Sequence, residues 1–455
     1  MQRYLDVVEK AKNLHEQGKL RDAAYLYEHL LGAQPNDAVV LYLYGTLCSQ
    51  IKQYGLAITL LRAATQKAPK LSEAWHNLGV TYRNEGHAEW ARSAYRKAIN
   101  LEPKNGDYIA MMSGAYINTG TPEAALTWAD KALEINPDNC QARNNKALAL
   151  LELGRYAEAW PYYRTRYELP HLVDNKRPYT CPKWAGEATR KLAIHGEQGL
   201  GDEIMYLSCL SEVTGPAVDI VIECAPRLRR VVERTFGVPC YGTHDELIAA
   251  HPDVTAYLPI GDLPTFCRQT VDDFPGTPYL KADPALVSEY RDMLAHYGEG
   301  PYIGVAWHGG TKGTHQEIRN PPLAMWGEIR KAPATFVSLQ YGEYGLDGAV
   351  ELEIPHWQET IDDLDRQTAL IAALDLVITP CQTAVHIAGA LGVTCWCLTP
   401  SSPAWRYGMT GDRMPWYQSV RLVRQKGREW SGVMGQVAKE LHDFAKLHRS
   451  EQAAA

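Results

Sequence analysis

The segment GEQGLGDE, residues 196–203, combines residue types that could do chemistry. It follows the apolar stretch KLAIH and precedes a helical pattern. Backbone amides at Gly199 and Gly201 could approach a ligand closely, and a helix N-terminus favours negative charge. Asp202 could cap that helix, or it could act as a general base toward an acceptor hydroxyl. The segment lacks GxGxxG spacing and a GK[ST] sequence, so it predicts neither a NAD site nor a P-loop.

A second turn of this kind is CQTAVHIAGALG, residues 381–392, which again follows an apolar strand pattern and opens a helix. Small residues there, including Thr383 and Ala384, would leave the N-terminal amides of the helix free to bind a diphosphate. His386 falls on the first turn. It could contact such a ligand, or it could be a core histidine that is hydrogen-bonded within the fold.

Charged residues suggest two further sites. The polar loop 306–320 carries Lys312 and Arg319, which could neutralise phosphate or could be exposed surface charge. Asp363 and Asp365 form a DxD pair that directly precedes a helical pattern. Acidic residues at that position stabilise the helix dipole, so capping is favoured over metal binding.

These motifs lie within an α/β pattern. Apolar strand patterns alternate with helical ones from residue 191 onward, and alternation of this kind predicts parallel sheets with helices on both faces. A Pro/Gly-rich stretch near 275–301 separates two such blocks. Two Rossmann-like blocks that face a cleft bind ligands at the carboxyl ends of their strands. Aromatic residues in 405–408 and 415–425 could wall that cleft or pack against a final helix over 429–447.

The first part of the chain is a repeat. Prolines recur every 34 residues from Pro35 to Pro137, and alanines recur with the same step from Ala23 to Ala159. This period is typical of tetratricopeptide helix–turn–helix units. Four full repeats span 4–137, and a fifth fades after Tyr163. Such a solenoid could bind a peptide or protein in its groove, or it could serve as a scaffold for the attached domain.

Composition narrows the function classes. The 455 residues carry a net charge of −7, which argues against a protein that coats nucleic acid or an anionic membrane. Residues 1–168 have net charge +2 and the remainder −9. Ten scattered cysteines without a CxxC pair indicate reduced thiols. Neither a signal peptide nor an apolar run of about 20 residues is evident, so a cytoplasmic protein is expected.

Three segments together resemble a known family. They are KWAGEATRKLAIHGEQGLGDEIMY (183–206), GVAWHGGTKGT (304–314), and the region 374–425 that contains HIAGALG and WYQSVRLVRQ. They resemble bacterial tetratricopeptide-repeat glycosyltransferases, whose catalytic half is similar to glycosyltransferase family nine, the ADP-heptose–lipopolysaccharide heptosyltransferases. The domain order is similar to that of protein O-GlcNAc transferases.

The resemblance implies a GT-B fold, a nucleotide-diphosphate sugar as co-substrate, no cofactor, and inversion without a metal. It implies that Asp202 is the general base and that Lys312 contacts phosphate. It also implies a diphosphate and sugar site on the 383–386 turn, formed by Thr383, Ala384 and His386, and a nucleotide contact at Gln340. Many relatives carry Asp-Thr where this chain has Cys381-Gln382, so the donor need not be heptose. Cys381 is predicted to be a small buried hydrophobe.

We therefore expect a solenoid over 1–168, an acceptor-side Rossmann-like domain over 169–300, and a donor-side one over 301–455. The expected activity is sugar transfer to a hydroxyl of a protein or glycan that the repeats recruit. One alternative is a non-catalytic sugar-nucleotide-binding adaptor. Another is a glycosyltransferase that acts on a modified nucleic acid base. The negative charge of the catalytic half argues against a long nucleic-acid groove but leaves a few local phosphate contacts open.

Overall fold

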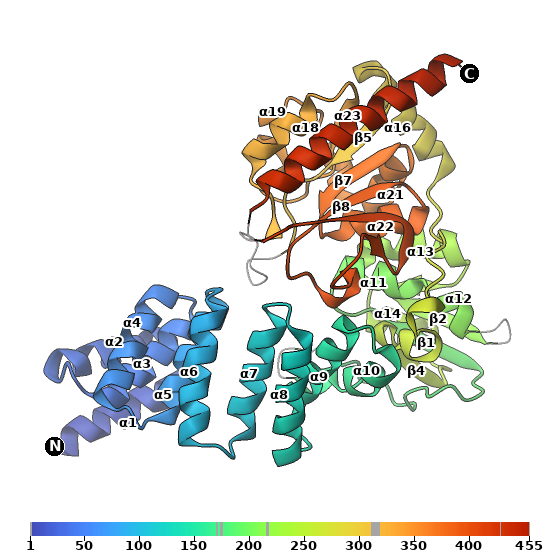
Figure 1. Ribbon diagram of the computed structural model, residues 1–455. Helices are drawn as coiled ribbons and strands as arrows, with labels where there is room; N and C mark the ends of the chain where they lie inside the picture. Colours follow the sequence, from blue (N-terminus) through green and yellow to red (C-terminus); the bar gives the residue numbers. More distant parts are fainter. Residues whose placement is uncertain are drawn as a thin grey trace. The chain divides into compact units, whose positions relative to one another are not determined.

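The computed structural model of the protein describes residues 2–169, 172, 176–214, 218–310, 319–427 and 429–454 (Figure 1). The chain divides into two compact units, Met1–Leu150 and Leu151–Ala455. The domain boundaries predicted after residues 168 and 300 are not tested by this division and stay predictions. Among the described residues, no helix has the length and apolar character needed to cross a membrane.

The first unit is a solenoid of antiparallel helix pairs. Each proline of the 34-residue series lies two residues beyond the end of a helix, as Pro35 does after α2, because proline cannot extend the hydrogen-bond ladder. Gly79 permits close packing, since a Cβ there would lie 2.5 Å from a ring carbon of Tyr95. The helices are α1 (Gln2–Glu16), α2 (Leu20–Ala33), α3 (Ala38–Gln50), α4 (Tyr54–Lys67), α5 (Ser72–Asn84), α6 (Ala88–Leu101), α7 (Gly106–Ile117), α8 (Pro122–Ile135) and α9 (Cys140–Glu152).

The second unit begins with α10 (Tyr156–Tyr163) and then forms a parallel sheet. The strand order is β3–β2–β1–β4, and β1 is central, with Leu192 in register with both Ile220 and Ala256. The strands are β1 (Lys191–His195), β2 (Asp219–Glu223), β3 (Cys240–Tyr241) and β4 (Ala256–Pro259). The helices of this block are α11 (Leu200–Leu207), α12 (Leu210–Val213), α13 (Arg229–Phe236), α14 (His244–Ala250) and α15 (Pro264–Cys267).

A second sheet has the order β6–β5–β7–β8–β10–β9, parallel except for the last pair. Its strands are β5 (Tyr302–Val305), β6 (Thr335–Ser338), β7 (Leu376–Pro380), β8 (Cys395–Thr399), β9 (Arg413–Met414) and β10 (Tyr417–Arg424). The helices are α16 (Pro284–Tyr297), α18 (Trp326–Arg330), α19 (Gly345–Glu351), α20 (Gln358–Asp362), α21 (Leu364–Ala372), α22 (Thr383–Leu391) and α23 (Ser431–Ala454).

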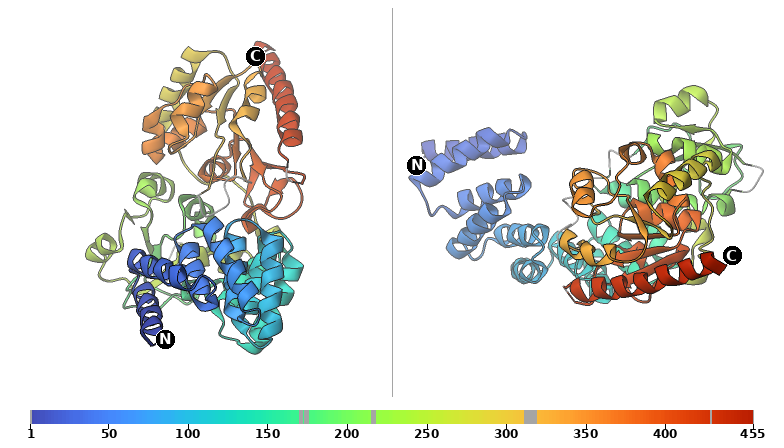
Figure 2. Two further views of the ribbon diagram at one scale, coloured as in Figure 1. Left: turned by 90° about the vertical axis from the view of Figure 1, so that its left-hand side faces the viewer. Right: turned by 90° about the horizontal axis from the view of Figure 1, so that it is seen from above.

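The last helix closes one face of the second sheet. Figures 1 and 2 show α23 running along the strands, and Val433, Val437 and Leu441 share a buried core with Ile303 and Leu376. The expected final helix and the expected parallel sheets are thus confirmed. The Pro/Gly-rich stretch expected to separate the blocks contains α16, which packs against α21.

Candidate functional site

The turn from β1 to α11 is built around buried ion pairs. Arg166 donates to both carboxylate oxygens of Glu197, and the backbone N–H of Gly261 donates to the same carboxylate at 2.8 Å. Gln198 adopts the left-handed conformation with φ 64°, and its Nε2 donates to Tyr163 Oη at 2.8 Å. A non-glycine residue in this conformation is held there by its surroundings, so the turn has a fixed shape.

Asp202 does not cap α11, because the N-cap position is Gly199 and Asp202 lies inside the first turn. Its Oδ1 accepts a hydrogen bond from Nη2 of Arg406, which comes from the other sheet's block. Both side chains are about one-fifth exposed, at 19% and 18%. The pair therefore joins the two α/β blocks at a point that solvent can still reach.

Arg406 is a residue that the sequence argument missed as a site candidate. Its Nε is buried and has no hydrogen-bond partner among the described residues. In the sequence, residues 405–408 (WRYG) were assigned a possible role only for their aromatic side chains. An arginine has five N–H donors, so Arg406 retains free donors next to Asp202.

The turn from β7 to α22 carries no charged residue of its own. Gln382 is the N-cap position of α22 and gives no side-chain cap; its Nε2 donates to Thr379 Oγ1 at 2.7 Å. No side chain of the described residues accepts from the first amides of the helix, although the N–H of Val385 donates to the carbonyl of Gln382 at 3.1 Å. Ala384 is buried and Thr383 is half-buried at this end. The site expected at the start of this helix stays a prediction, with the backbone free to serve it.

His386 lies where α22 meets the other block. Its Nδ1 is 3.3 Å from Tyr417 Oη and its Nε2 is 3.3 Å from Tyr407 Oη. Burial, and to a smaller extent the charge of Arg406, lowers the pKa of His386 to about 3. The ring is therefore neutral near pH 7 and both nitrogens are engaged, so a ligand would have to displace a tyrosine to reach it.

The two turns are brought into direct contact. A Cβ on Gly201 would lie 2.8 Å from Cδ2 of His386, so glycine at this position allows α11 to approach α22. Gly201 thereby has a packing role, whereas the predicted contacts of Gly199 and Gly201 with a donor stay untested. The candidate base and the candidate anion site lie on two helices that touch.

Cys381, at the start of the second turn, is buried as predicted, with Sγ 3.7 Å from Sγ of Cys397. Burial alone would raise its pKa, but the hydrogen bond from Cys397 and the charges of Arg319 and Arg406 lower it. The charges of Arg319 and Arg406 that lower this pKa would also stabilise a bound anion.

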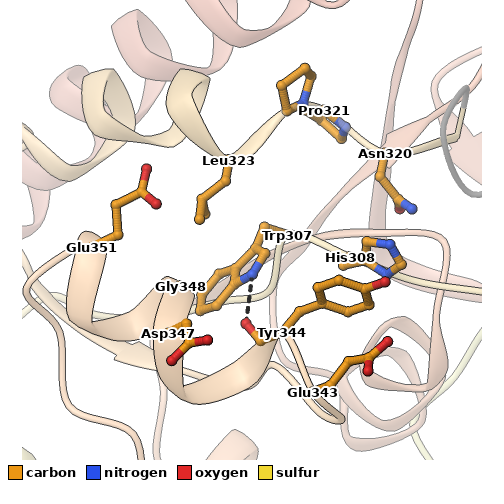
Figure 3. A pocket seen from close by; sticks show the side chains of 11 residues that line it. Trp307, His308, Asn320, Pro321, Leu323, Glu343, Tyr344, Asp347, Gly348 and Glu351 are labelled. Carbon is orange, nitrogen blue, oxygen red and sulfur yellow. Dashed lines mark hydrogen bonds between the residues drawn. The ribbon is translucent and has the colours of Figure 1, made fainter.

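A pocket of about 340 Å³ opens beside this turn at the ends of β5 and β6 (Figure 3). The buried Trp307 forms its floor, and Trp307 Nε1 donates to the carbonyl of Tyr344 at 3.2 Å. The ring of Tyr344 stacks on His308 with centroids 4.2 Å apart. The pocket is lined by Trp307, His308, Asn320, Pro321, Pro322, Leu323, Glu343, Tyr344, Asp347, Gly348 and Glu351.

Gly309 connects this pocket to α22. Asn320, on the pocket wall, accepts from Gly309 N at 3.0 Å and donates to Gly309 O at 3.1 Å. A Cβ on Gly309 would lie 3.0 Å from the carbonyl oxygen of Cys381. The loop after β5 therefore runs from the aromatic pocket directly to the N-terminus of the helix.

Gln340 holds the backbone of the pocket wall through its side-chain amide. Its Oε1 accepts from the backbone N–H groups of Trp307 and His308 at 2.9 and 2.7 Å. Its Nε2 donates to the carbonyls of His308 and Tyr341, both at 2.9 Å. The buried amide is thus fully used by the backbone. Its predicted nucleotide contact stays untested, and its observed role is to hold the loop that carries His308.

The other charged candidates fall in different places. Lys312 lies outside the described residues, whereas Arg319 lies near Cys381 and influences its pKa. Asp363 caps α21 by accepting from the N–H of Asp365 at 2.9 Å, which confirms the capping interpretation of the DxD pair. Asp365 itself accepts from Arg234 at 2.6 Å.

The aromatic segments do not line the pocket at Trp307. The second segment packs in part on the last helix, because Val423 shares a buried core with Val433 and Val437. The aromatic rings themselves lie elsewhere. Trp405 lies 6.1 Å from Trp160, 6.2 Å from Tyr163 and 6.1 Å from Trp416, measured between ring centroids. These contacts tie the segment that carries Arg406 to α10. The aromatic cluster therefore fixes Arg406 opposite Asp202.

Comparison with known proteins adds to this geometry. Models of the tetratricopeptide repeat match residues 14–79, 72–105, 107–139 and 128–160, which confirms the repeats. Protein FlbA of Caulobacter vibrioides is 30% identical over 455 residues, covering 93% of this chain and 76% of FlbA. Protein O-mannosyl-transferase TMTC1 of Mus musculus is 23% identical over 141 residues, which is 30% of this chain and 15% of that protein.

Solved structures also match part of the chain. The crystal structure of MamA has 22% sequence identity and a TM-score of 0.32, and the match covers 36% of this chain and 97% of MamA. A thermophilic TPR protein of Thermus thermophilus has 21% identity and a TM-score of 0.33 over 38% of this chain and 94% of its own length.

Proposed function

The chain belongs to the family of protein FlbA, and we propose, from the geometry of its two turns, that it is an inverting glycosyltransferase of the GT-B type. It would transfer a sugar from a nucleotide-diphosphate sugar to a hydroxyl group of a protein or glycan. The contact between the two turns carries this proposal, because it brings a carboxylate to the helix end that suits an anionic leaving group.

The aromatic pocket provides a place for the nucleoside. Its floor is Trp307, and the stacked pair of His308 and Tyr344 offers a flat surface for a base. Glu343 and Asp347 at its rim could accept hydrogen bonds from ribose hydroxyls but would repel phosphate. A bound donor would therefore extend from this pocket, along Gly309, toward the N-terminus of α22.

The proposed reaction uses the groups at that end. The acceptor oxygen attacks the anomeric carbon while the bond from that carbon to the diphosphate oxygen breaks, and Asp202 takes the acceptor proton. Arg406 and the first backbone amides of α22 would stabilise the charge that develops on the leaving diphosphate. Asp202 must give up its hydrogen bond to Arg406 first, and an arriving diphosphate offers Arg406 an alternative partner.

The tetratricopeptide repeats support an interaction with a protein. We assign to them the recruitment of the acceptor or of a partner that carries it. The enzyme would act in the cytoplasm, where nucleotide sugars are made, and would need no resident cofactor or metal.

A thermal-shift titration of the full chain tests donor binding. UDP, ADP, GDP and CMP, each with its common sugar conjugates, would be compared. A ligand at 100 times its dissociation constant should add about 2.7 kcal/mol of stability. Tyr344→Ala should weaken the response to the active nucleotide at least about tenfold, since it removes the stacking surface. Tyr297→Ala removes a tyrosine that is 58% exposed outside the pocket, so it should leave the response unchanged.

A non-catalytic adaptor is the second candidate, and one observation favours it. Cys381-Gln382 replaces the Asp-Thr pair of many relatives, and Gln382 is occupied by Thr379. The adaptor would bind the nucleotide sugar without cleaving it, so no free nucleotide would form and no protein would be modified. Mass spectrometry of proteins incubated with the chain and its donor distinguishes the two, because only the enzyme adds a sugar mass.

A further inference from the structure

A second pocket lies in the first α/β block, apart from the site described above. It has a volume of about 230 Å³ and opens at the carboxyl ends of β1 and β4, under the segment that follows α10. Pockets for drug-sized ligands span about 300–1,000 Å³, so this one suits a smaller molecule. Its lining includes Arg164, Glu168, Lys176, Arg177, Lys183 and Tyr257.

Cations line this pocket in front of carboxylates that are buried behind them. Lys183 and Arg164 lie 2.6 and 3.5 Å from Oδ2 of Asp262, and each cation is 30% exposed while Asp262 is fully buried. Arg177 is 26% exposed and lies 2.6 Å from Oε1 of Glu223, which is 5% exposed. Glu168 also lines the pocket and is exposed, so a ligand meets four positive groups and one carboxylate.

These cations can donate to more than one acceptor at a time. An ammonium has three N–H donors and a guanidinium five, so one carboxylate contact does not exhaust them. Asp262 is also held from the core by Arg166, whose Nη1 lies 2.7 Å from Oδ1. Arg166 in turn pairs with Glu197, so the four cations Arg164, Lys176, Arg177 and Lys183 stand against Asp262, Glu223 and the lining Glu168, which leaves one net positive charge among the described residues of the pocket.

The remaining walls are aromatic. Tyr257 and His195 line the inner end, with ring centroids 6.2 Å apart. Burial lowers the pKa of His195, so its ring is neutral near pH 7. Its Nδ1 lies 3.3 Å from the carbonyl oxygen of Gly196. A cationic mouth with an uncharged aromatic end suits a small molecule that is charged at one end only.

We propose that this pocket binds the phosphate group of a small phosphorylated molecule. Arg164, Lys183 and the pair Lys176–Arg177 come from separate stretches of chain and converge on one space, which suits a group with several acceptor oxygens. The body of the molecule would lie against Tyr257 and His195. This site requires neither a nucleotide in the Trp307 pocket nor sugar transfer.

Calorimetric titration of the full chain at low salt tests the proposal, with inorganic phosphate and glucose 6-phosphate as probes. Both should bind saturably at one site, glucose 6-phosphate more tightly. Lys176→Glu reverses an exposed charge at the pocket and should weaken both at least about tenfold. Lys70→Glu makes the same change at an exposed position of the solenoid and should have no effect. A thermal melt verifies that each variant is folded.

Four results would overturn the proposal. The first three are no saturable binding, equal loss in both lysine variants, and glucuronate binding as tightly as glucose 6-phosphate, which would show that the pocket recognises a carboxylate. Arg406→Lys gives the fourth, because Arg406 is the residue proposed to contact the phosphates of the donor. Phosphate binding should survive that variant, and its loss there would assign the phosphate to the donor site.

Discussion

The two turns described above each connect a parallel strand to the helix that follows it, but their side chains differ in charge. The β1–α11 turn carries Glu197, Asp202 and Glu203, and each is held by a partner: Glu197 by Arg166, Asp202 by Arg406, and Glu203 by the N–H of Ala225 at 3.0 Å. The β7–α22 turn, residues 381–392, contains no charged side chain.

This difference decides what each helix end can attract. The positive end of the α11 dipole already faces two carboxylates in its first turn, so a phosphate there would meet like charge. The α22 end is uncharged, lacks a side-chain cap, and has Arg319 and Arg406 nearby. The first turn is suited to holding a carboxylate, and the second is suited to receiving an anion.

The largest expected effect comes from removing the charge of the first turn. Asp202→Asn keeps the size of the side chain and loses the proton acceptor, so turnover should fall at least about 100-fold while nucleotide binding stays nearly intact. Initial rates of sugar transfer check the loss of turnover, and the thermal shift measured on the same preparation checks that nucleotide binding is kept. Asp245→Asn on α14 is the matched control, since Asp245 is exposed and lies outside both turns.

Unchanged turnover in Asp202→Asn would remove Asp202 from the role of base. Lost nucleotide binding would mean instead that the Asp202–Arg406 pair maintains the donor site. Arg406→Lys separates these outcomes further. It keeps one charge but loses the planar fork, so it should weaken diphosphate binding more than it changes folding.

The next effect tests how tightly the second turn must pack. A Cβ on Gly389 of α22 would lie 2.3 Å from Cγ of Tyr417, and the ring cannot move freely because it is buried. Gly389→Ala should therefore lower the free energy of unfolding by about 1–3 kcal/mol. Gly435 on α23 has no atom within 4 Å of such a Cβ, so Gly435→Ala should raise it by about 0.5–1 kcal/mol. Urea unfolding of the two variants gives the comparison, and equal effects would contradict it.

The sequence predicted these turns well because their signals are local. Helix α22 spans the predicted residues 383–391, since an apolar strand pattern followed by small residues fixes a strand–turn–helix unit. The short strands β3, β4 and β9 were missed, because two to four residues carry too little periodicity to be recognised. The pairing of Asp202 with Arg406 spans 204 positions, and only the packing of two blocks reveals it. Likewise, Gln340 gave no sign in the sequence that its amide would be used entirely by the backbone.

The smallest effect is a difference in pH dependence between the turns. Burial raises the pKa of Glu203 to about 7, so the folded state binds a proton that the unfolded state releases, and stability falls as pH rises from about 4.5 to 7. The pKa of His386 is lowered to about 3, so stability falls in the opposite direction, as pH drops below about 6.5. Between pH 5 and 6.5 each contributes about 2 kcal/mol, with opposite sign.

The two contributions should nearly cancel in the wild-type protein, and single variants should expose them. Relative to wild type, Glu203→Gln should become less stable as pH falls from 6.5 to 5, because the His386 slope remains without its counterpart. His386→Gln should become less stable as pH rises over the same range. Urea unfolding at four pH values, taken as differences from wild type, removes the titrations common to all three proteins. If the free energy of unfolding changed with pH in the same way in all three proteins, the pKa values of Glu203 and His386 would not be shifted by burial. The two turns would then be more accessible to solvent than the structure indicates.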